Sequence, residues 1–419
     1  FILEIVDRMP GTGTMADPYQ VWTADHLYEF ARIVNSSTDR IYGILKADIS
    51  LNDTSDWQNW GERAPANTWT PMGLSQAKNY KGGFDGCGHT ISGIYVDSPG
   101  SDHVGFFGYV SAVTTIKNLN LTKSFFRGRE GVGGICGTLA GLCKLENCSC
   151  ALTVRGEKFV GGLSGNVVIG TAAIQGCANA STVAGNDWVG GIAGNNCGTI
   201  SFCSNSGAIS GSRAGGICGV SSGTLSNVFS TGAVSGDLNT GGLCGTMNGL
   251  VASLASLTSC YSSGTVADQV NSAAICGSTN PYCTFSDCYY LTGSAANGIG
   301  HNAGGYGALG LSGDEFSSGE AAYRLGAAFG QTLGTDLCPV FRSPEGSNGV
   351  YRLLYLSEGE QHAKQYYNPG AAVSAAAIST PAKGGYIFSH WEGLPDRMPT
   401  ADVTATAVFL PAAVPLAPR

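Results

Sequence analysis

The sequence predicts an all-β protein: a right-handed parallel β-helix with a helical cap at its N-terminal end and a small β domain at its C-terminal end. Three observations support this prediction. Glycine-rich pentads recur at short intervals, a second set of motifs recurs in step with them, and glycine supplies 63 of the 419 residues. Hydrophobic residues make up 43% of the chain, which excludes disorder, and the glycines lack the three-residue period of collagen.

The pentads define a repeating unit of about 25–30 residues. Each unit holds two or three short β-prone runs and cannot bury its apolar side alone, so the units are expected to stack with every strand on its equivalent in the next turn. Stacked turns lie about 4.8 Å apart. The pentads lie at 133–137, 161–165, 190–194, 215–219, 241–245 and, in degenerate form, 273–277, with an earlier copy at 104–108. The second set is centred on Cys148, Cys177, Cys203, Val228, Cys260 and Cys288.

One unit shows the consensus clearly: VGGIAGN at 189–195, GTI at 198–200 and CSNSGAI at 203–209. This pattern resembles the GLUG-motif repeats of bacterial surface proteins and of the non-catalytic parts of some large secreted proteases. The resemblance covers about residues 11–291. It implies a β-helix in an extracellular bacterial protein, and it implies no particular ligand.

The chain is expected to divide into five parts. A strand within 44–51 and the run KGGFDGCGHTISG at 81–93 are expected to open the solenoid. The parts are an N-terminal cap with the first strands (1–80), the repeat β-helix (81–291), a C-terminal packing segment and linker (292–350), a small β domain (351–412) and a tail (413–419).

Two segments carry helical patterns. Residues 23–35 place Leu27, Phe30, Ala31 and Val34 on one face, with Thr23 as the N-cap, which predicts an amphipathic helix that covers the open end of the solenoid. Such a cap is expected because an exposed terminal turn would offer unpaired strand edges. A second helix is predicted at 312–325.

The C-terminal part has a different composition. GYIFSHW at 385–391 and MPTADVTATA at 398–407 resemble the internalin B-repeat type of small β-grasp-like domain, which occurs in tandem on the surfaces of Gram-positive bacteria. The resemblance implies an extracellular spacer or binding module. Trp391 and Tyr386 are expected in the core of this domain, and the alternative is that they stack on a ligand.

Composition excludes several partners. Charged residues make up 12% of the chain and the net charge is −8, so nucleic acid and anionic membranes are poor partners. No apolar stretch reaches the roughly 18 residues of a spanning helix, so no membrane insertion is expected. The start, Phe1-Ile2-Leu3-Glu4, is too short and too acidic for a signal peptide, which suggests a mature or excised piece of a secreted or cell-surface protein.

The repeats contain few residues suited to catalysis. Only ten charged residues lie between Gly131 and Tyr290, and the six histidines have no zinc-binding spacing. Asp85 and His89 are four residues apart and could meet Asp48, a weak candidate for acid–base chemistry. Ser164 stands in a pentad and is read as structural. The sequence therefore predicts no catalytic, cofactor-binding or metal-binding residue.

The 15 cysteines are read from their repeat positions. Cys136, Cys218, Cys244 and Cys276 share one position, and Cys148, Cys177, Cys203, Cys260 and Cys288 share another, which is typical of interior packing. Two alternatives stay open: buried free thiols, or several disulfides, for which Cys143/Cys148, Cys197/Cys203 and Cys283/Cys288 are close enough along the chain. Metal binding at Cys143, Cys148 and Cys150 has little support because no histidine is near.

Pairs of Asn, Ser and Thr recur at the turns and are expected to line an exposed edge. They either serve turn formation or bind sugars or peptides. The sequence thus predicts a non-catalytic extracellular protein, an adhesin or a scaffold or filament component, that binds host or matrix glycans or proteins or associates end to end. The alternatives are a carbohydrate-active β-helix enzyme and a non-catalytic segment of a large secreted protease. The pairs are Asn195-Asn196, Ser221-Ser222, Asn239-Thr240 and Asn271-Ser272.

Overall fold

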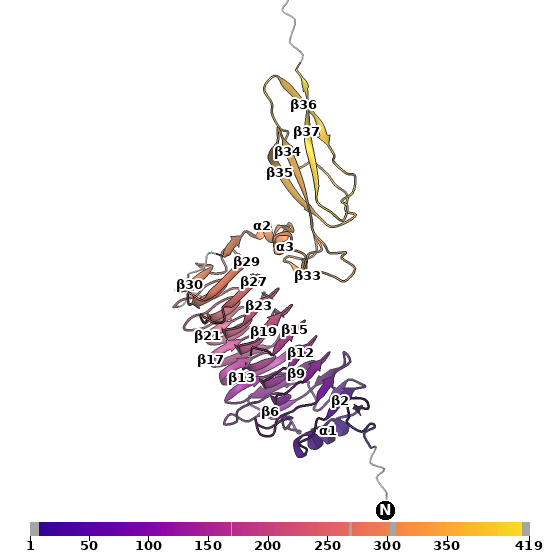
Figure 1. The fold of residues 1–419 in the computed structure, drawn as a ribbon, viewed down its shortest axis with the longest axis vertical. Helices are drawn as coiled ribbons and strands as arrows, with labels where there is room; N and C mark the ends of the chain where they lie inside the picture. The colour runs from indigo at the N-terminus through magenta and orange to yellow at the C-terminus, as the bar shows by residue number, and fades with distance from the viewer. Residues whose placement is uncertain (1–7, 169, 268–269, 302–306, 413–419) are drawn as a thin grey trace, which may run out of the picture. The chain divides into compact units, whose positions relative to one another are not determined.

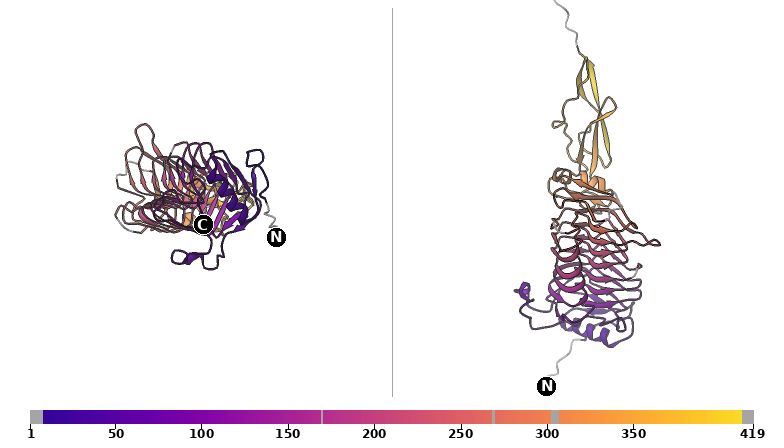
Figure 2. Two further views of the ribbon diagram at one scale, coloured as in Figure 1. Left: turned by 90° about the horizontal axis from the view of Figure 1, so that it is seen from below. Right: turned by 90° about the vertical axis from the view of Figure 1, so that its left-hand side faces the viewer.

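The computed structural model describes residues 8–168, 170–267, 270–301 and 307–412, so the expected tail at 413–419 lies outside the described residues. The chain divides into two compact units, residues 1–310 and 311–419, each described here by itself. The first unit is a parallel β-solenoid (Figure 1). Figure 2 shows its turns stacked one upon another. The predicted all-β solenoid fold is therefore confirmed, whereas the finer boundaries at 80, 291 and 350 stay predictions.

One sheet of the solenoid is formed by the pentads. It has eight strands in the order β30-β28-β26-β22-β18-β14-β11-β7, so each strand lies between its equivalents in the neighbouring turns. The fourth residues of successive pentads are register partners, from Phe107 through Cys136, Ser164, Ala193, Cys218 and Cys244 to Cys276. The strands are β7 (Phe107–Val110), β11 (Cys136–Leu139), β14 (Ser164–Val167), β18 (Ala193–Asn196), β22 (Cys218–Ser221), β26 (Cys244–Met247), β28 (Cys276–Thr279) and β30 (Ile299–His301).

The remaining solenoid strands belong to a 23-stranded sheet that wraps around the other sides of each turn. They are β1 (Tyr19–Val21), β2 (Tyr42–Leu45), β3 (Ile49–Ser50), β4 (Gly83–Asp85), β5 (Thr90–Ser92), β6 (Tyr95–Asp97), β8 (Thr115–Lys117), β9 (Asn120–Arg127), β10 (Glu130–Gly133), β12 (Lys144–Glu146), β13 (Ser149–Gly161), β15 (Ala173–Gln175), β16 (Ala178–Asn179), β17 (Thr182–Gly190), β19 (Thr199–Ser201), β20 (Ser204–Asn205), β21 (Ile209–Gly215), β23 (Thr224–Ser226), β24 (Phe229–Ser230), β25 (Val234–Ser235), β27 (Ala255–Ser262), β29 (Cys283–Leu291) and β31 (Ala308–Leu311).

The core is built from stacked aliphatic side chains. In a three-residue strand such as β19 the central residue, Ile200, points inward and is fully buried, while Thr199 and Ser201 point outward because side chains alternate between the faces of a strand. The register places equivalent central residues one turn apart. This column runs through Ile116, Leu145, Ile174, Ile200, Leu225 and Leu257.

The pentad glycines lie where backbone meets backbone. A Cβ atom on Gly190 would overlap the carbonyl oxygen of Ala193, and one on Gly215 would overlap that of Cys218. Only a residue without a side chain fits there, so these pentad positions require glycine.

Each turn bends at two positions with left-handed backbone conformation. The first corner column has φ of 50° to 65° and the second has φ of 49° to 69°. Most of these residues are not glycine, although L-residues seldom adopt this conformation. The first corner column is Cys87, Asn118, Asn147, Gly176, Phe202, Asn227, Ser259 and Asp287; the second is His103, Gly131, Phe159, Trp188, Arg213, Asn239 and Asn271.

The predicted N-terminal helix is present as α1 (Ala24–Ser36), and a short 3-10 helix, η1 (Trp57–Asn59), follows later. The Thr23 hydroxyl accepts a hydrogen bond from the His26 amide, which confirms the N-cap. Leu27 and Phe30 are fully buried, and the Phe30 ring lies 5.6 Å from that of Phe84. The helix therefore contributes its apolar face to the core at the N-terminal end of the solenoid.

The second unit contains two short helices and two small sheets. The predicted continuous helix at 312–325 is wrong: α2 (Gly313–Ser317) and α3 (Glu320–Leu325) are separated by Gly319, whose φ of 93° breaks the helical backbone. Ser312 and Glu315 form a capping box at α2. One sheet pairs β32 (Phe329–Gly330) with β33 (Val340–Phe341); the other has the order β35-β34-β37-β36, with β34 (Tyr351–Ser357), β35 (Glu360–Tyr367), β36 (Tyr386–Glu392) and β37 (Val403–Pro411).

Candidate ligand-binding surfaces of the solenoid

The acid–base candidates meet only in part. His89 Nδ1 lies 3.2 Å from Asp48 Oδ1, and the Thr90 amide donates to the same oxygen. These hydrogen bonds, the one from Thr90 first, lower the pKa of Asp48. Asp85 does not join them, because it accepts hydrogen bonds from the Cys87 amide and from Asn118 and faces the Lys117 ammonium at 3.2 Å.

Partial burial raises the pKa of Asp85, but its hydrogen bonds and the Lys117 charge outweigh this effect and hold the pKa below its ordinary value. Both aspartates of the candidate cluster are therefore stabilised as carboxylates by different neighbours. That these residues have no catalytic role stays a prediction.

The expected exposed edge of Asn, Ser and Thr is wrong in half of its residues. Asn196, Ser221 and Thr240 are fully buried, and Ser272 is 7% exposed. The Asn196 amide donates to the Ser221 hydroxyl at 3.1 Å, so these side chains form an interior ladder between turns. Successive side chains point alternately inward and outward at the corner, so one residue of each pair is buried and its neighbour is partly exposed.

A different surface presents aligned hydroxyl groups. We call it the hydroxyl face; it is the outer side of strands β19, β23, β27 and β29. The register forms two columns, and hydroxyls of adjacent turns are hydrogen-bonded, Ser256 to Thr224 at 3.3 Å and Ser286 to Thr258 at 3.2 Å. No charged residue belongs to it. Its residues are Thr199, Thr224, Ser256 and Thr284 in one column and Ser201, Ser226, Thr258 and Ser286 in the other.

The second corner column carries an aromatic stack. The rings of Phe159 and Trp188 lie 4.8 Å apart and within 10° of parallel, and the Arg213 guanidinium lies 4.4 Å from the Trp188 ring on the next turn. Lys158 Nζ lies 4.7 Å from the Phe159 ring and 4.8 Å from the Trp188 ring. We call these four residues the corner stack. All four side chains are partly exposed.

The cations of the corner stack are paired. Arg213 donates from Nε to Asp187 Oδ1 at 2.7 Å and also pairs its terminal nitrogen with Asp187 Oδ2. Lys158 Nζ lies 3.8 Å from Glu130. The surface at this corner therefore combines flat apolar rings with charges that are locally balanced.

An amide ladder runs beside the corner stack. Asn195 donates to Asn166 Oδ1 at 2.8 Å, and both residues lie on the outer side of the pentad sheet. That this column borders the second corner column is shown at other turns, where His103 Nδ1 lies 2.8 Å from Thr138 Oγ1 and Asn239 donates to Thr246. The sequence reasoning missed this site, although the two aromatic residues occupy one repeat position in consecutive units.

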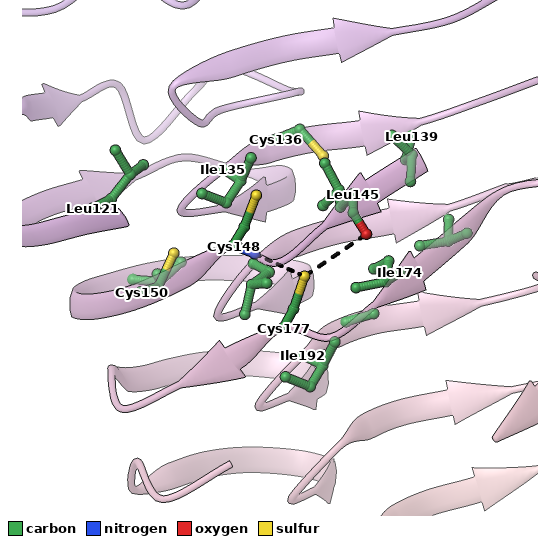
Figure 3. Packing of buried hydrophobic residues seen from close by; sticks show 14 of the residues in the cluster. Leu121, Ile135, Cys136, Leu139, Leu145, Cys148, Cys150, Ile174, Cys177 and Ile192 are labelled. Atoms are coloured by element: carbon green, nitrogen blue, oxygen red, sulfur yellow. Dashed lines mark hydrogen bonds between the residues drawn. The ribbon is translucent and has the colours of Figure 1, made fainter. Parts of the chain in front are cut away.

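The cysteine columns lie in the core. Cys148 and Cys177 pack beside Leu145 and Ile174, and the Cys148 amide donates to the Cys177 sulfur at 3.4 Å (Figure 3). Burial raises the pKa of the Cys136 thiol to about 12 and that of Cys143 to about 11. The columns and the three candidate pairs are free thiols in the structure. The prediction of interior packing is thus confirmed, and the structure favours the free-thiol alternative.

The two aromatic residues that were predicted for the core of the C-terminal β domain differ in burial. Trp391 packs against the core residue Tyr355, with ring centroids 4.9 Å apart, as predicted. Tyr386 is 44% exposed, so its expected place in the core is wrong. It is the first residue of β36 and lies beyond the buried cluster, with Lys383 Nζ 4.7 Å from its ring.

Two features are absent from the described part of the chain. No group of three or more His, Cys, Asp or Glu residues there could hold a metal ion. None of its helices is long and apolar enough to cross a membrane.

Comparison with known proteins gives local similarity. No protein-family model matches the chain. Halomucin of Haloquadratum walsbyi is 31% identical over 160 residues, which is 38% of this chain and 2% of halomucin. A protein described as a Gly-rich membrane protein of Evansella cellulosilytica is 28% identical over 131 residues, 31% of this chain and 14% of that protein. The chain therefore spans a small part of these relatives.

A protein from Bacteroides ovatus described as an immunoglobulin A1 protease superposes with a TM-score of 0.48 at 21% identity, over 79% of this chain and 94% of that chain.

Proposed function

We propose that this chain is a non-catalytic part of an extracellular surface protein, in which the solenoid serves as an adhesin or scaffold that presents aligned side chains to a ligand. The observation that carries this proposal is the register. Stacking turns equivalent outward residues of successive units into columns, and a column offers the same group about every 4.8 Å along the surface. Such a surface suits an extended or repetitive ligand of host or matrix origin.

Other observations support an extracellular role. The names of the two relatives, halomucin and a Gly-rich membrane protein, fit proteins of the cell surface. The low charge content and net charge of −8 disfavour nucleic acid as a partner. The core is formed by the inward-facing residues of each strand. Packing of the core therefore does not require serine or threonine at the outward positions of the hydroxyl face.

Binding to arrays of glycans and extracellular-matrix proteins tests the proposal, with an unrelated β-helix as the control. A saturable signal that one soluble ligand competes away is the expected result. Thr224→Val and Thr258→Val keep the shape and remove a hydroxyl, so they show whether the hydroxyl face takes part.

Two outcomes would contradict the adhesin role. One is the absence of any saturable binding, which would leave a passive scaffold or end-to-end assembly; light scattering over a range of concentrations then distinguishes these two. The other is release of reducing ends from a polysaccharide, lost on Asp85→Asn or His89→Ala, which would establish the enzyme instead.

A further inference from the structure

The second corner column contains two residues that its backbone does not favour. Phe159 and Trp188 both have φ of 52°, in the left-handed region that bulky side chains seldom adopt. The same position holds Gly131 one turn earlier and Asn239 and Asn271 in later turns, residues that this conformation accepts readily. The backbone does not favour bulky side chains at these two corners, and the two rings stack on each other there, a combination that points to a role beyond folding.

The stack leaves one ring face without a neighbour from its own column. Trp188 is covered by Phe159 on one side and by Arg213 on the other. Gly131 is directly adjacent to Phe159 in the ladder, since Glu130 pairs with Lys158 and Val132 with Val160. Because Gly131 has no side chain, the adjacent turn places no side chain of the column against the second face of the Phe159 ring. The next residue of the column, His103, has its Nδ1 3.5 Å from where a Cβ on Gly131 would lie.

A few polar groups lie near this face of the Phe159 ring. The Asn166 amide nitrogen has no hydrogen-bond partner among the described residues, and Asn166 lies in the column bordering Phe159. The Lys158–Glu130 ion pair, at the level of Phe159 and Gly131, supplies a donor and an acceptor without a net charge. A flat apolar ring with a few polar groups at its rim and no excess charge matches a sugar ring, which has an apolar C–H face and peripheral hydroxyls.

We propose that the corner stack, with Asn166 and Asn195, binds a pyranose ring of a neutral glycan on the Gly131-facing side of Phe159. This inference rests on the proposed ligand-binding function and names the ligand class and the place. Balanced charges disfavour anionic glycans, and the exposed hydrogen-bonding groups disfavour a purely apolar partner.

The chain itself supplies the test variants. Phe159→Asn and Trp188→Asn place at these corners the residue that stands there in two other turns, so the backbone accepts it. Gly131→Asn adds a side chain against the proposed binding face and leaves both rings in place. Phe202→Asn is the matched control, because Phe202 is also an aromatic residue with φ of 52°, but in the first corner column.

The experiment measures binding of the full chain and the four variants to a panel of neutral and anionic glycans and of matrix proteins. The unaltered protein is expected to bind a neutral glycan, with at least about tenfold weaker binding for the three second-corner variants and unchanged binding for Phe202→Asn. Urea unfolding of each variant establishes that the solenoid is intact.

The remaining outcomes separate the two proposals. Glycan binding that all four variants retain, or binding to a matrix protein alone, would overturn the corner site and leave the proposed function standing. Binding confined to anionic glycans would overturn the ligand class. No binding by the unaltered protein would overturn both the corner site and the adhesin role.

Discussion

At the scale of single residues, the corners of the solenoid combine backbone strain with surface function. A non-glycine residue in the left-handed region costs about 1–2 kcal/mol. At Phe159 and Trp188 the strained backbone carries two rings that stack on each other. At Ser259 the same backbone conformation carries only a small polar side chain.

Ser259→Gly is expected to stabilise the solenoid. It removes the left-handed strain but gives the unfolded chain more freedom, which costs about 0.5–1 kcal/mol, so the net gain is roughly 0.5–1 kcal/mol. Ser226→Gly is the control, because Ser226 lies within β23 without a positive φ, so the same change should destabilise there by about 0.5–1 kcal/mol. Urea midpoints of the two variants should therefore move in opposite directions, and a common direction would contradict the strain argument.

His103 should make stability depend on pH. Burial lowers the pKa of its imidazole below the ordinary value of 6.5, so the unfolded chain takes up a proton more readily than the folded one. The contribution of neutral His103 to the free energy of unfolding is fully present above pH 6.5. It is lost as the pH falls from 6.5 through the lower pKa that His103 has in the folded protein.

His103→Asn is expected to flatten the decline of stability in this acidic window, because asparagine does not titrate there and stands at the same corner in Asn239 and Asn271. Urea unfolding at several pH values measures the difference between the two proteins. An equal decline in both would show that other groups account for the pH dependence.

At the scale of elements, helix α1 depends on its N-cap as well as on its apolar face. Thr23→Ala removes the acceptor for the His26 amide and should weaken the helix by about 1 kcal/mol, while Thr23→Ser keeps the acceptor and should cost little. Amide hydrogen exchange of residues 24–36 is the suitable measurement. Faster exchange in both variants, or in neither, would contradict the capping role.

The strands show why element length limits prediction. Most strands of the solenoid have two to four residues, too few for a periodic pattern to reveal which side is buried. The helix predicted at 312–325 failed for a local reason, since Gly319 adopts φ of 93° and separates two short helices. A glycine inside an apolar run is compatible with either outcome until packing selects one.

At the scale of the whole molecule, the solenoid interior should protect its thiols. The column cysteines are buried and burial raises the pKa of the Cys136 thiol to about 12, so they should react with iodoacetamide only in denaturant. Cys87 is exposed and should be modified in the native protein, although partial burial of its thiol and the charge of Asp85 raise its pKa.

Mass-spectrometric mapping of the modified peptides, with and without prior reduction, checks this prediction. Column peptides that are labelled in denaturant without reduction would support free thiols. Labelling that requires a reductant would establish disulfides between or within turns, the alternative that the sequence left open.

The sequence by itself determined the repeat and therefore the solenoid, the helical cap and the membership of the pentad and cysteine columns. Pentads and cysteines at matched spacings specify which residues stack, because a unit with one apolar side is stable only against its own copy. Of the candidate acid–base cluster, only His89 and Asp48 meet.

Only the tertiary structure decided which side of each turn faces solvent. It placed Asn196 and Ser221 inside, put the hydroxyls of Thr199 and Ser226 outside, and formed the corner stack. The physical reason is that alternation has a period of two, so a shift of one residue at a corner reverses every side chain, and corner conformation depends on the packing of the neighbouring turns.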